Sequence, residues 1–123
     1  MQSAALTYQI IGAAIEVHNI LGPGFLESIY KHALLRELGL QGLRAASETE
    51  VAIAYKEHTV GNHRLDIVVE DTVIVELKAV SAITDVHIAQ ALSYLKATNI
   101  ELALIFNFGA PSLVWKRLIK SRE

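Results

Sequence analysis

The chain has 123 residues, of which 52% are hydrophobic, and a formal net charge of −2. This length suits a single domain over residues 1–123 and leaves no room for a second. Cysteine is absent, which excludes a disulfide framework and a thiolate zinc site and makes the cytoplasm the default location. Charged residues interrupt every apolar stretch before the roughly 18–20 residues that cross a bilayer, and no basic segment precedes the first stretch as in a signal peptide, so no membrane partner is expected.

The acidic balance is unusual for a tight nucleic-acid binder, but the charges are unevenly distributed. Residues 48–101 are mainly acidic, whereas basic side chains gather near the C-terminus at Lys116, Arg117, Lys120 and Arg122. Such a tail either contacts phosphates or is simply solvated, and the second case is the commoner.

Two helices are predicted in the first third of the chain. Residues 6–21 place apolar side chains at the spacing of an amphipathic helix, with Ser3 or Thr7 as candidate caps. The Gly-Pro-Gly sequence at residues 22–24 ends this helix.

The second helix is predicted from residue 25 to about residue 38, with Gly39 as its C-cap. Its first turn contains Glu27, and Tyr30 lies one turn later on the same side. The helix dipole alone accounts for an acidic residue in a first turn, so Glu27 does not by itself indicate function.

A strand is predicted over residues 48–55, followed by a turn at residues 56–58. Thr59 and Val60 extend the returning strand, and the Gly-Asn pair at residues 61–62 predicts a bend or bulge within it. Bulges of this kind often lie beside active sites.

The stretch VIVELKAV, residues 73–80, predicts a buried strand because aliphatic residues surround only Glu76 and Lys78. Side chains alternate along a strand, so these two charges share one face, roughly 6–7 Å apart. Burying them is costly unless they are paired or hold a metal, and a purely structural strand would avoid that cost.

The preceding strand, residues 64–70, pairs with this one as a hairpin whose loop length decides the geometry. A two-residue loop would set Asp66 opposite Leu77 and turn it away from Glu76. A three-residue loop sets Asp66 opposite Glu76 and leaves the other face wholly apolar, with Leu65 opposite Leu77. The hydrophobic pattern favours the three-residue loop.

A helix is predicted over residues 85–97, after a capping segment at residues 81–84. Its apolar and polar residues fall on two faces. The predicted core stripe contains Ile88, Leu92 and Leu95, and the separate face contains His87, Gln90 and Tyr94.

Residues 102–108 predict a central strand, and residues 113–119 predict a weaker edge strand that contains Trp115. The order of elements is thus α-α-β-β-β-α-β with a short final strand. Three antiparallel strands precede a helical crossover, which predicts an α/β fold with a mixed sheet flanked by helices.

Two carboxylates on neighbouring strands with a lysine beside them suit a divalent-metal phosphodiesterase. Asp66 and Glu76 supply the hard oxygen ligands that Mg²⁺ or Mn²⁺ prefers, and Lys78 can orient water or stabilise developing charge. The same spacing also occurs by chance, and a cross-strand salt bridge between Asp66 and Lys78 is a purely structural alternative.

Several separated stretches resemble one protein family. Residues 24–30 match the pattern G-x-x-E-x-x-Y, and VHNILGPGFLESIY, RLDIVVEDTVIVELKAV and HIAQALSYLKAT together resemble the GxxExxY family of the PD-(D/E)XK nuclease-like superfamily. The resemblance covers residues 11–108 and implies a restriction-endonuclease-like αβββαβ core. Leu65 stands where the superfamily's name has proline, which is a variable position, and the tail from residue 109 matches least.

The resemblance also implies roles for individual residues. Asp66 and Glu76 would bind Mg²⁺ or Mn²⁺, and Lys78 would be the motif lysine. Glu27 would be a helix-borne carboxylate that reaches the metal or a metal-bound water. The resemblance further implies that Gln90 and Tyr94, which form a Q-x-x-x-Y pair, contact the substrate. The signature tyrosine, Tyr30, either contacts the substrate as well or only packs with its ring.

Two hypotheses of different classes follow. The leading one is a small metal-dependent nuclease that cleaves DNA, or alternatively RNA, by in-line attack of a metal-activated water. The rival is a non-catalytic module that binds nucleic acid or a protein partner, or forms a homodimer, while it keeps the nuclease fold; the negative charge and small size favour it.

His32, His58 and His87 show no H-x-x-x-H or similar zinc-binding spacing among themselves. A structural or surface role is the simplest interpretation for each of the five histidines. Among them His18 is the best candidate to border the site, and His63 is close to Asp66 along the chain.

Overall fold

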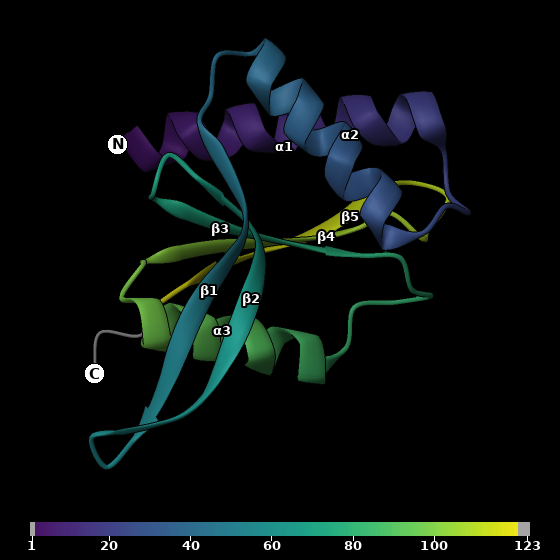
Figure 1. Ribbon diagram of the computed structural model, residues 1–123. Coiled ribbons are helices and arrows are strands. Elements are labelled where there is room, and N and C mark those ends of the chain that lie inside the picture. Colours follow the sequence, from purple (N-terminus) through teal and green to yellow (C-terminus); the bar gives the residue numbers. More distant parts are fainter. Residues whose placement is uncertain (1, 121–123) are drawn as a thin grey trace.

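The computed structural model describes residues 2–120, with side chains from residue 4 onwards (Figure 1). Within these residues, helices and strands follow one another in the predicted order. The elements are α1 (Gln2–Leu21), α2 (Glu27–Leu40), β1 (Ala45–Tyr55), β2 (His58–Val69), β3 (Val73–Lys78), α3 (Asp85–Thr98), β4 (Leu102–Asn107) and β5 (Val114–Ile119).

A single mixed sheet, with the strand order β1-β2-β3-β4-β5, forms the centre of the described structure. β3 and β4 are parallel, and the other neighbouring strands are antiparallel. Helix α3 connects the two parallel strands and covers one face of the sheet, while α1 and α2 cover the other (Figure 1). The predicted α/β fold, with a mixed sheet flanked by helices, is therefore confirmed.

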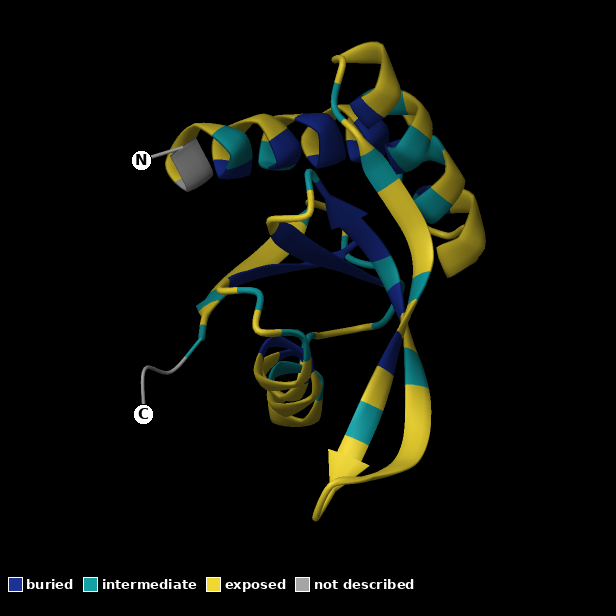
Figure 2. Ribbon diagram, turned by 60° about the vertical axis from the view of Figure 1, so that its left-hand side comes forward, coloured by how far each residue is buried: buried dark blue, intermediate teal, exposed yellow. Residues whose placement is uncertain are grey.

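The core consists of two layers, one on each face of the sheet. The larger layer, between the sheet and helices α1 and α2, includes Leu34 and Phe106, and the smaller layer, beneath α3, includes Ile74 and Leu95. Figure 2 shows the buried residues on the surfaces that face the sheet. This burial on both faces explains why β3 and β4 are almost continuously apolar.

The starts of the two N-terminal helices differ from the prediction. α1 begins at Gln2, so Thr7 lies inside the helix and does not cap it. The backbone of Ser3 is helical as well, and its side chain lies outside the described residues. α2 begins at Glu27 rather than at residue 25, because Leu26 still has an extended backbone at the N-cap.

The end of α2 also differs, because the helix continues past Gly39 to Leu40. Gly42 takes the left-handed conformation instead, with φ of 80°. The amides of Gly42 and Leu43 donate to the carbonyls of Gly39 and Leu38, each at 3.0 Å. The later glycine thus satisfies the last carbonyls of the helix, and Gly39 is not the C-cap.

β1 and β2 form a long hairpin that extends beyond the rest of the molecule (Figures 1 and 2). β1 begins at Ala45 rather than at residue 48, because Ala45 already pairs with the end of β2. At the tip, Lys56 and Glu57 both have positive φ angles, of 49° and 71°. This is the two-residue turn whose twist matches that of the strands.

The predicted bulge in this hairpin is present, slightly earlier than expected. The register shifts between Ile53 and Ala54, whose partners are Gly61 and Thr59. Val60 therefore has no partner in the described ladder, and the irregularity begins one residue before the predicted bend at residue 61.

The register of β2 and β3 is the one that a three-residue loop predicts, with Val69 opposite Val73 and Ile67 opposite Val75. The expected pairing of Leu65 with Leu77 is wrong. Leu65 is buried in the layer beneath α3, whereas Leu77 belongs to the layer beneath α1 and α2. β2 pairs with β3 only from Ile67 to Val69, so Leu65 lies outside this ladder, and the twist common to strands can turn its side chain to the other layer.

Helix α3 starts after Thr84, whose hydroxyl accepts a hydrogen bond from the amide of His87, as the predicted capping segment requires. The predicted division into faces is wrong in two positions. Leu92 is 42% exposed, whereas Tyr94 is buried together with Ala91 and Leu95. The buried stripe of α3 therefore consists of Ala91, Tyr94 and Leu95.

β4 is buried throughout, and β5 is an exposed edge strand, both as predicted. Among the described helices, none is long and apolar enough to cross a membrane.

Candidate active site

β2 and β3 separate at the point where the predicted carboxylates stand. Their backbone ladder ends with Ile67 and Val75, one position before Asp66 and Glu76. Beyond it, the amide of Asp66 donates to Glu76 Oε2 at 3.2 Å, and the amide of Leu77 donates to Asp66 Oδ2 at 2.9 Å. Because buried amides need acceptors, the two carboxylates replace the carbonyls of the ladder and are fixed in place by the backbone.

The electrostatic environment of Glu76 is unfavourable for a negative charge. Its side chain is buried, with 7% exposure. Burial, and after it the neighbouring charge of Asp66, raises the pKa of Glu76 to about 8, although the nearby Lys78 ammonium acts in the opposite direction. Without a cation, Glu76 therefore tends to keep its proton at neutral pH, and a bound cation would favour its ionised form, which is a property of carboxylate sites that bind a cation.

These donors fit a magnesium-type ion better than a fully protein-bound metal. Within residues 2–120, no three histidine, aspartate or glutamate side chains are arranged to hold a metal ion. Mg²⁺ commonly binds through one or two carboxylates and keeps several waters. Asp66 and Glu76 supply that number of carboxylates, so the pair fits Mg²⁺ or Mn²⁺ as the two metal ligands.

Glu27 lies at the same site but on a different element. It occupies the first turn of α2 and lines a pocket of about 260 Å³ together with Ser28, Lys31, Asp66 and Leu77. This position suits contact between Glu27 and a metal-bound water better than direct binding of the metal as a third ligand. Direct metal binding by Glu27 stays a prediction.

Lys31 is the pocket residue that the sequence interpretation missed. It follows Glu27 by four residues, so the two share one face of α2. The Lys31 ammonium lies 2.8 Å from Glu48 Oε2, and its side chain is only 14% exposed. The available signal was this helical spacing from Glu27, but nothing in the sequence indicated that Glu48 on β1 would be the partner.

Lys78 is the last residue of β3 and is half-buried. Its carbonyl accepts a hydrogen bond from the amide of Phe108 at 2.8 Å. Its ammonium is close enough to lower the pKa of Glu76, yet among the described residues it forms no ion pair. The alternative of a structural salt bridge between Asp66 and Lys78 is therefore not realised among the described residues, and the cation is available near the carboxylates.

Tyr30 is a fully buried residue that organises the loop before Glu27. Its hydroxyl donates to the carbonyl of Gly22 at 2.6 Å and accepts from the amide of Phe25 at 3.1 Å. Its ring stacks on Phe108, with centroids 4.6 Å apart. Of the two roles left open for Tyr30, this geometry supports positioning of the loop, and substrate contact stays a prediction that the burial argues against.

Tyr94 projects from α3 toward the carboxylates. Burial, together with the charges of Glu76 and Asp66, raises the pKa of Tyr94 to about 12, so its hydroxyl keeps its proton and is a donor. The ring stacks on His63 with centroids 4.1 Å apart, and the hydroxyl lies 3.4 Å from His63 Nδ1. The structure thus brings Tyr94 and His63 to the site, whichever tautomer His63 adopts.

Two other predicted residues are not brought into contact with the carboxylates. Gln90 is exposed on α3, and no hydrogen bond links it to the rest of the described residues. His18 is buried; its Nε2 lies 2.9 Å from the carbonyl of Ala110, and its ring packs near Phe108. His18 therefore fixes the end of α1, and contact between the exposed Gln90 and a substrate stays a prediction.

Comparisons with known proteins agree with this geometry. A family model described as the PD-(D/E)XK nuclease superfamily matches residues 4–118. The crystal structure of SSO0001 has a similar fold, with a TM-score of 0.60 at 16% sequence identity over 78% of this chain and 50% of that chain. This chain thus spans half the length of that protein. No protein of curated function matches the sequence.

Proposed function

This chain belongs to the PD-(D/E)XK nuclease superfamily, and we propose that it is a metal-dependent nuclease that hydrolyses phosphodiester bonds of DNA, with RNA as the alternative substrate. The observation that carries the proposal is the Asp66–Glu76 pair. Both carboxylates are fixed by backbone amides at the point where β2 and β3 separate, and Lys78 stands beside them without an ion-pair partner in the described chain. Structural strands rarely maintain such a costly cluster of charges.

Asp66 and Glu76 would hold Mg²⁺ or Mn²⁺, which supplies positive charge beside a phosphate and acidifies water. Lys78 orients the attacking water or stabilises the charge that develops on the phosphate oxygens. Glu27 faces the same pocket as Asp66 and can accept a hydrogen bond from that water. The protonated hydroxyl of Tyr94 donates a hydrogen bond to the substrate. Gln90, on the same side of α3, contacts the nucleic-acid strand from solvent.

Within the superfamily we place the chain in the GxxExxY group. Gly24, with φ of 114°, lies in the loop that the Tyr30 hydroxyl holds, and Glu27 follows this loop at the start of α2. The three signature residues therefore act together: glycine and tyrosine shape the loop, and the loop sets the position of the glutamate. This arrangement supports the interpretation that the signature residues position the Glu27 carboxylate.

A second candidate function is a module that binds nucleic acid or protein without cutting. It is favoured by the lack of a third metal ligand among the described residues. Both candidates predict a nucleic-acid or protein partner, but only the nuclease needs Lys78. The unpaired ammonium of Lys78 is the reason to prefer the nuclease.

The test is cleavage of labelled single- and double-stranded DNA and RNA with Mg²⁺ or Mn²⁺. We expect metal-dependent cleavage by the wild type that falls at least 100-fold in Lys78→Ala, since one group that stabilises a transition state contributes roughly this much. Lys56→Ala, at the exposed hairpin tip, is the matched control and should cut at the wild-type rate. Binding of nucleic acid without cleavage by any of the proteins would instead favour the module.

A further inference from the structure

Lys31 is a cation in the candidate active site that the proposed chemistry does not use. It lines the pocket shared with Glu27 and Asp66, and its side chain is 14% exposed. Holding a mostly buried ammonium costs desolvation energy unless an anion accompanies it. In the described structure that anion is Glu48, at 2.8 Å.

Glu48 reaches Lys31 because β1 is irregular at this position. The backbone of Glu48 is left-handed, with φ of 55°. The ladder with β2 pairs Ser47 with Ile67 and Thr49 with Leu65, but contains no pair between Glu48 and Asp66. A non-glycine residue with positive φ is strained, and such strain is concentrated at functional sites. The irregularity places the Glu48 carboxylate at the margin of the pocket that Asp66 lines.

A second cation shares the same carboxylate. Arg64 on β2 lies 3.5 Å from Glu48 Oε1 and 3.5 Å from Glu50 Oε2, and its side chain is 65% exposed. Lys31 binds the other oxygen of Glu48. Lys31 and Arg64 thus stand on either side of one carboxylate, in a row that leads from the pocket to solvent.

We propose that Lys31 and Arg64 bind backbone phosphates of a nucleic-acid strand next to the phosphate that is cleaved, and that Glu48 occupies both cations until the strand arrives. The inference rests on the proposed function in taking a nucleic-acid strand as the ligand, and it specifies the substrate as a polynucleotide rather than a mononucleotide ester. Glu48 is 52% exposed, and ion pairs at such exposed carboxylates are weak. A phosphate can therefore displace it, as lysine and arginine both bind phosphate well.

The sign of the variant effects separates this arrangement from an ordinary salt bridge. If Lys31 and Glu48 only stabilise the fold, removing either charge has no specific effect on the binding of nucleic acid. If Glu48 competes with phosphate, removing its charge tightens binding, whereas removing the Lys31 charge weakens binding. The two partners of one ion pair then act in opposite directions.

The experiment measures the affinity of a labelled 12-nucleotide single-stranded DNA by fluorescence anisotropy in EDTA, where nothing is cut. Lys31→Gln and Arg64→Gln should each weaken binding about five- to tenfold and reduce the salt dependence by about one phosphate contact. Glu48→Gln should tighten binding several-fold. Glu48→Asn is a second variant, because asparagine tolerates positive φ better, and it should act in the same direction.

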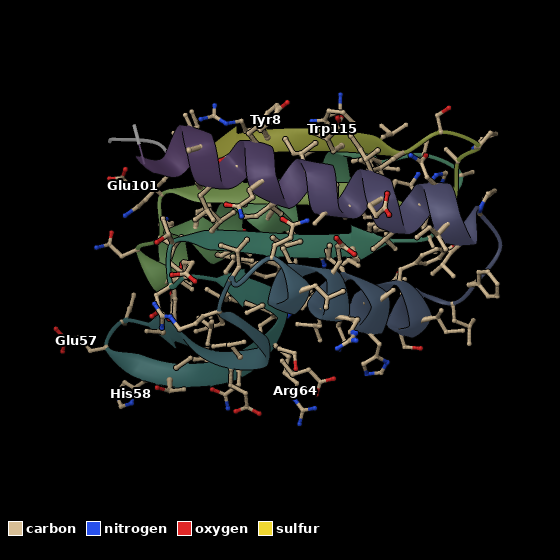
Figure 3. All side chains as sticks on the ribbon, turned by 90° about the horizontal axis from the view of Figure 1, so that it is seen from above. Tyr8, Glu57, His58, Arg64, Glu101 and Trp115 are labelled. Carbon is tan, nitrogen blue, oxygen red and sulfur yellow. The ribbon has the colours of Figure 1, made fainter. Side chains whose placement is uncertain are left out.

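Matched controls carry the same charge changes elsewhere. Lys116→Gln removes a cation from β5, the strand at the opposite edge of the sheet from the hairpin. Glu57→Gln removes an anion at the hairpin tip, far along the hairpin from Arg64 (Figure 3). Both controls should change the affinity by less than twofold.

Equal shifts in Lys31→Gln and Lys116→Gln, unchanged or weaker binding in the Glu48 variants, or no binding of DNA by the wild type would overturn the inference. The two proposals can fail separately. The predicted pattern of affinities without any metal-dependent cleavage would refute the nuclease but still support phosphate binding by Lys31 and Arg64. Cleavage without that pattern of affinities would refute only the proposed phosphate binding by Lys31 and Arg64.

Discussion

Glu76 is a carboxylate buried beside a second carboxylate, an arrangement that costs free energy when both are ionised. The cost has a local benefit, because the same oxygens accept hydrogen bonds from the amides of Asp66 and Leu77 at the end of the ladder. Positions fixed in this way need little rearrangement when a cation binds. The pair is thus preorganised at the expense of the stability of the metal-free protein.

This cost predicts how the metal-free protein responds to pH. The pKa of Glu76 is raised from its ordinary value of 4.5 to about 8 in the folded protein. Its contribution to stability is therefore fully present below pH 4.5 and is lost as the pH rises through 8. At roughly 1.4 kcal/mol per unit of pKa difference, the loss is a few kcal/mol.

Urea unfolding in EDTA between pH 5 and 9 measures this loss of stability with rising pH. Glu76→Gln should remove most of the decline and be more stable than the wild type at pH 8.5. A wild-type decline that persists unchanged in Glu76→Gln would show that other groups cause it.

The Tyr30 hydroxyl makes a second prediction at this scale. Its two hydrogen bonds, to the carbonyl of Gly22 and the amide of Phe25, fix the loop that leads to Glu27. Tyr30→Phe keeps the stacked ring but leaves these groups without that partner, and should cost about 1–2 kcal/mol of unfolding free energy. If the hydroxyl also positions Glu27, kcat should fall while KM for the oligonucleotide stays constant. An equal loss of stability with unchanged kcat would limit Tyr30 to packing.

At the scale of elements, the ends of β3 and β4 are joined where Lys78 emerges. Asn107 at the end of β4 accepts hydrogen bonds from the amides of Val80 and Gly109 through Oδ1 and donates to the carbonyl of Val80 through Nδ2, each at 3.0 Å. Gly109 is held so closely that a Cβ there would lie 2.4 Å from the Val80 carbonyl oxygen. These contacts hold the chain directly after Lys78.

A pair of glycine substitutions tests this connection. Gly109→Ala forces the two segments apart and should destabilise the protein by about 1–3 kcal/mol, with a fall in cleavage because Lys78 moves. Gly39→Ala is the control, since Gly39 lies inside α2 with nothing within 4 Å of an added Cβ, and it should stabilise by about 0.5–1 kcal/mol. Thermal unfolding of both variants provides the comparison. A neutral Gly109→Ala would contradict the close packing.

The sequence predicted the elements well where the pattern was local. Alternation along β2 and β3 was enough to predict the register from Ile67 to Val69 and to bring Asp66 close to Glu76, because a shift by one residue would have exchanged the two faces. The same logic failed at Leu65, because it assumed that the ladder continued to this residue, whereas β2 pairs with β3 only from Ile67 to Val69. For Leu92 and Tyr94 the helical period was right, but the rotation of α3 about its axis depends on how it packs against the sheet, which periodicity does not describe.

At the scale of the whole molecule, the site lies where four elements meet. α2 supplies Glu27 and Lys31, the separated strands supply the carboxylates, and α3 supplies Tyr94. Sequence patterns do not predict contacts between distant segments. The Lys31–Glu48 pair and the stacking of His63 on Tyr94 were therefore found only in the structure. The resemblance to a family named candidate side chains, whose roles stay predictions, and it did not show how the fold holds them.

The central claim is that Asp66 and Glu76 form a divalent-cation site, and its most direct test is the melting temperature at pH 8 in EDTA and in Mg²⁺ or Mn²⁺. A ligand that binds only the folded state stabilises it by about 2.7 kcal/mol at 100 times its Kd. We therefore predict a metal-dependent rise of several degrees for the wild type and for Glu57→Gln, and none for Asp66→Asn or Glu76→Gln. An equal rise in all four proteins, or no rise in the wild type, would contradict the account.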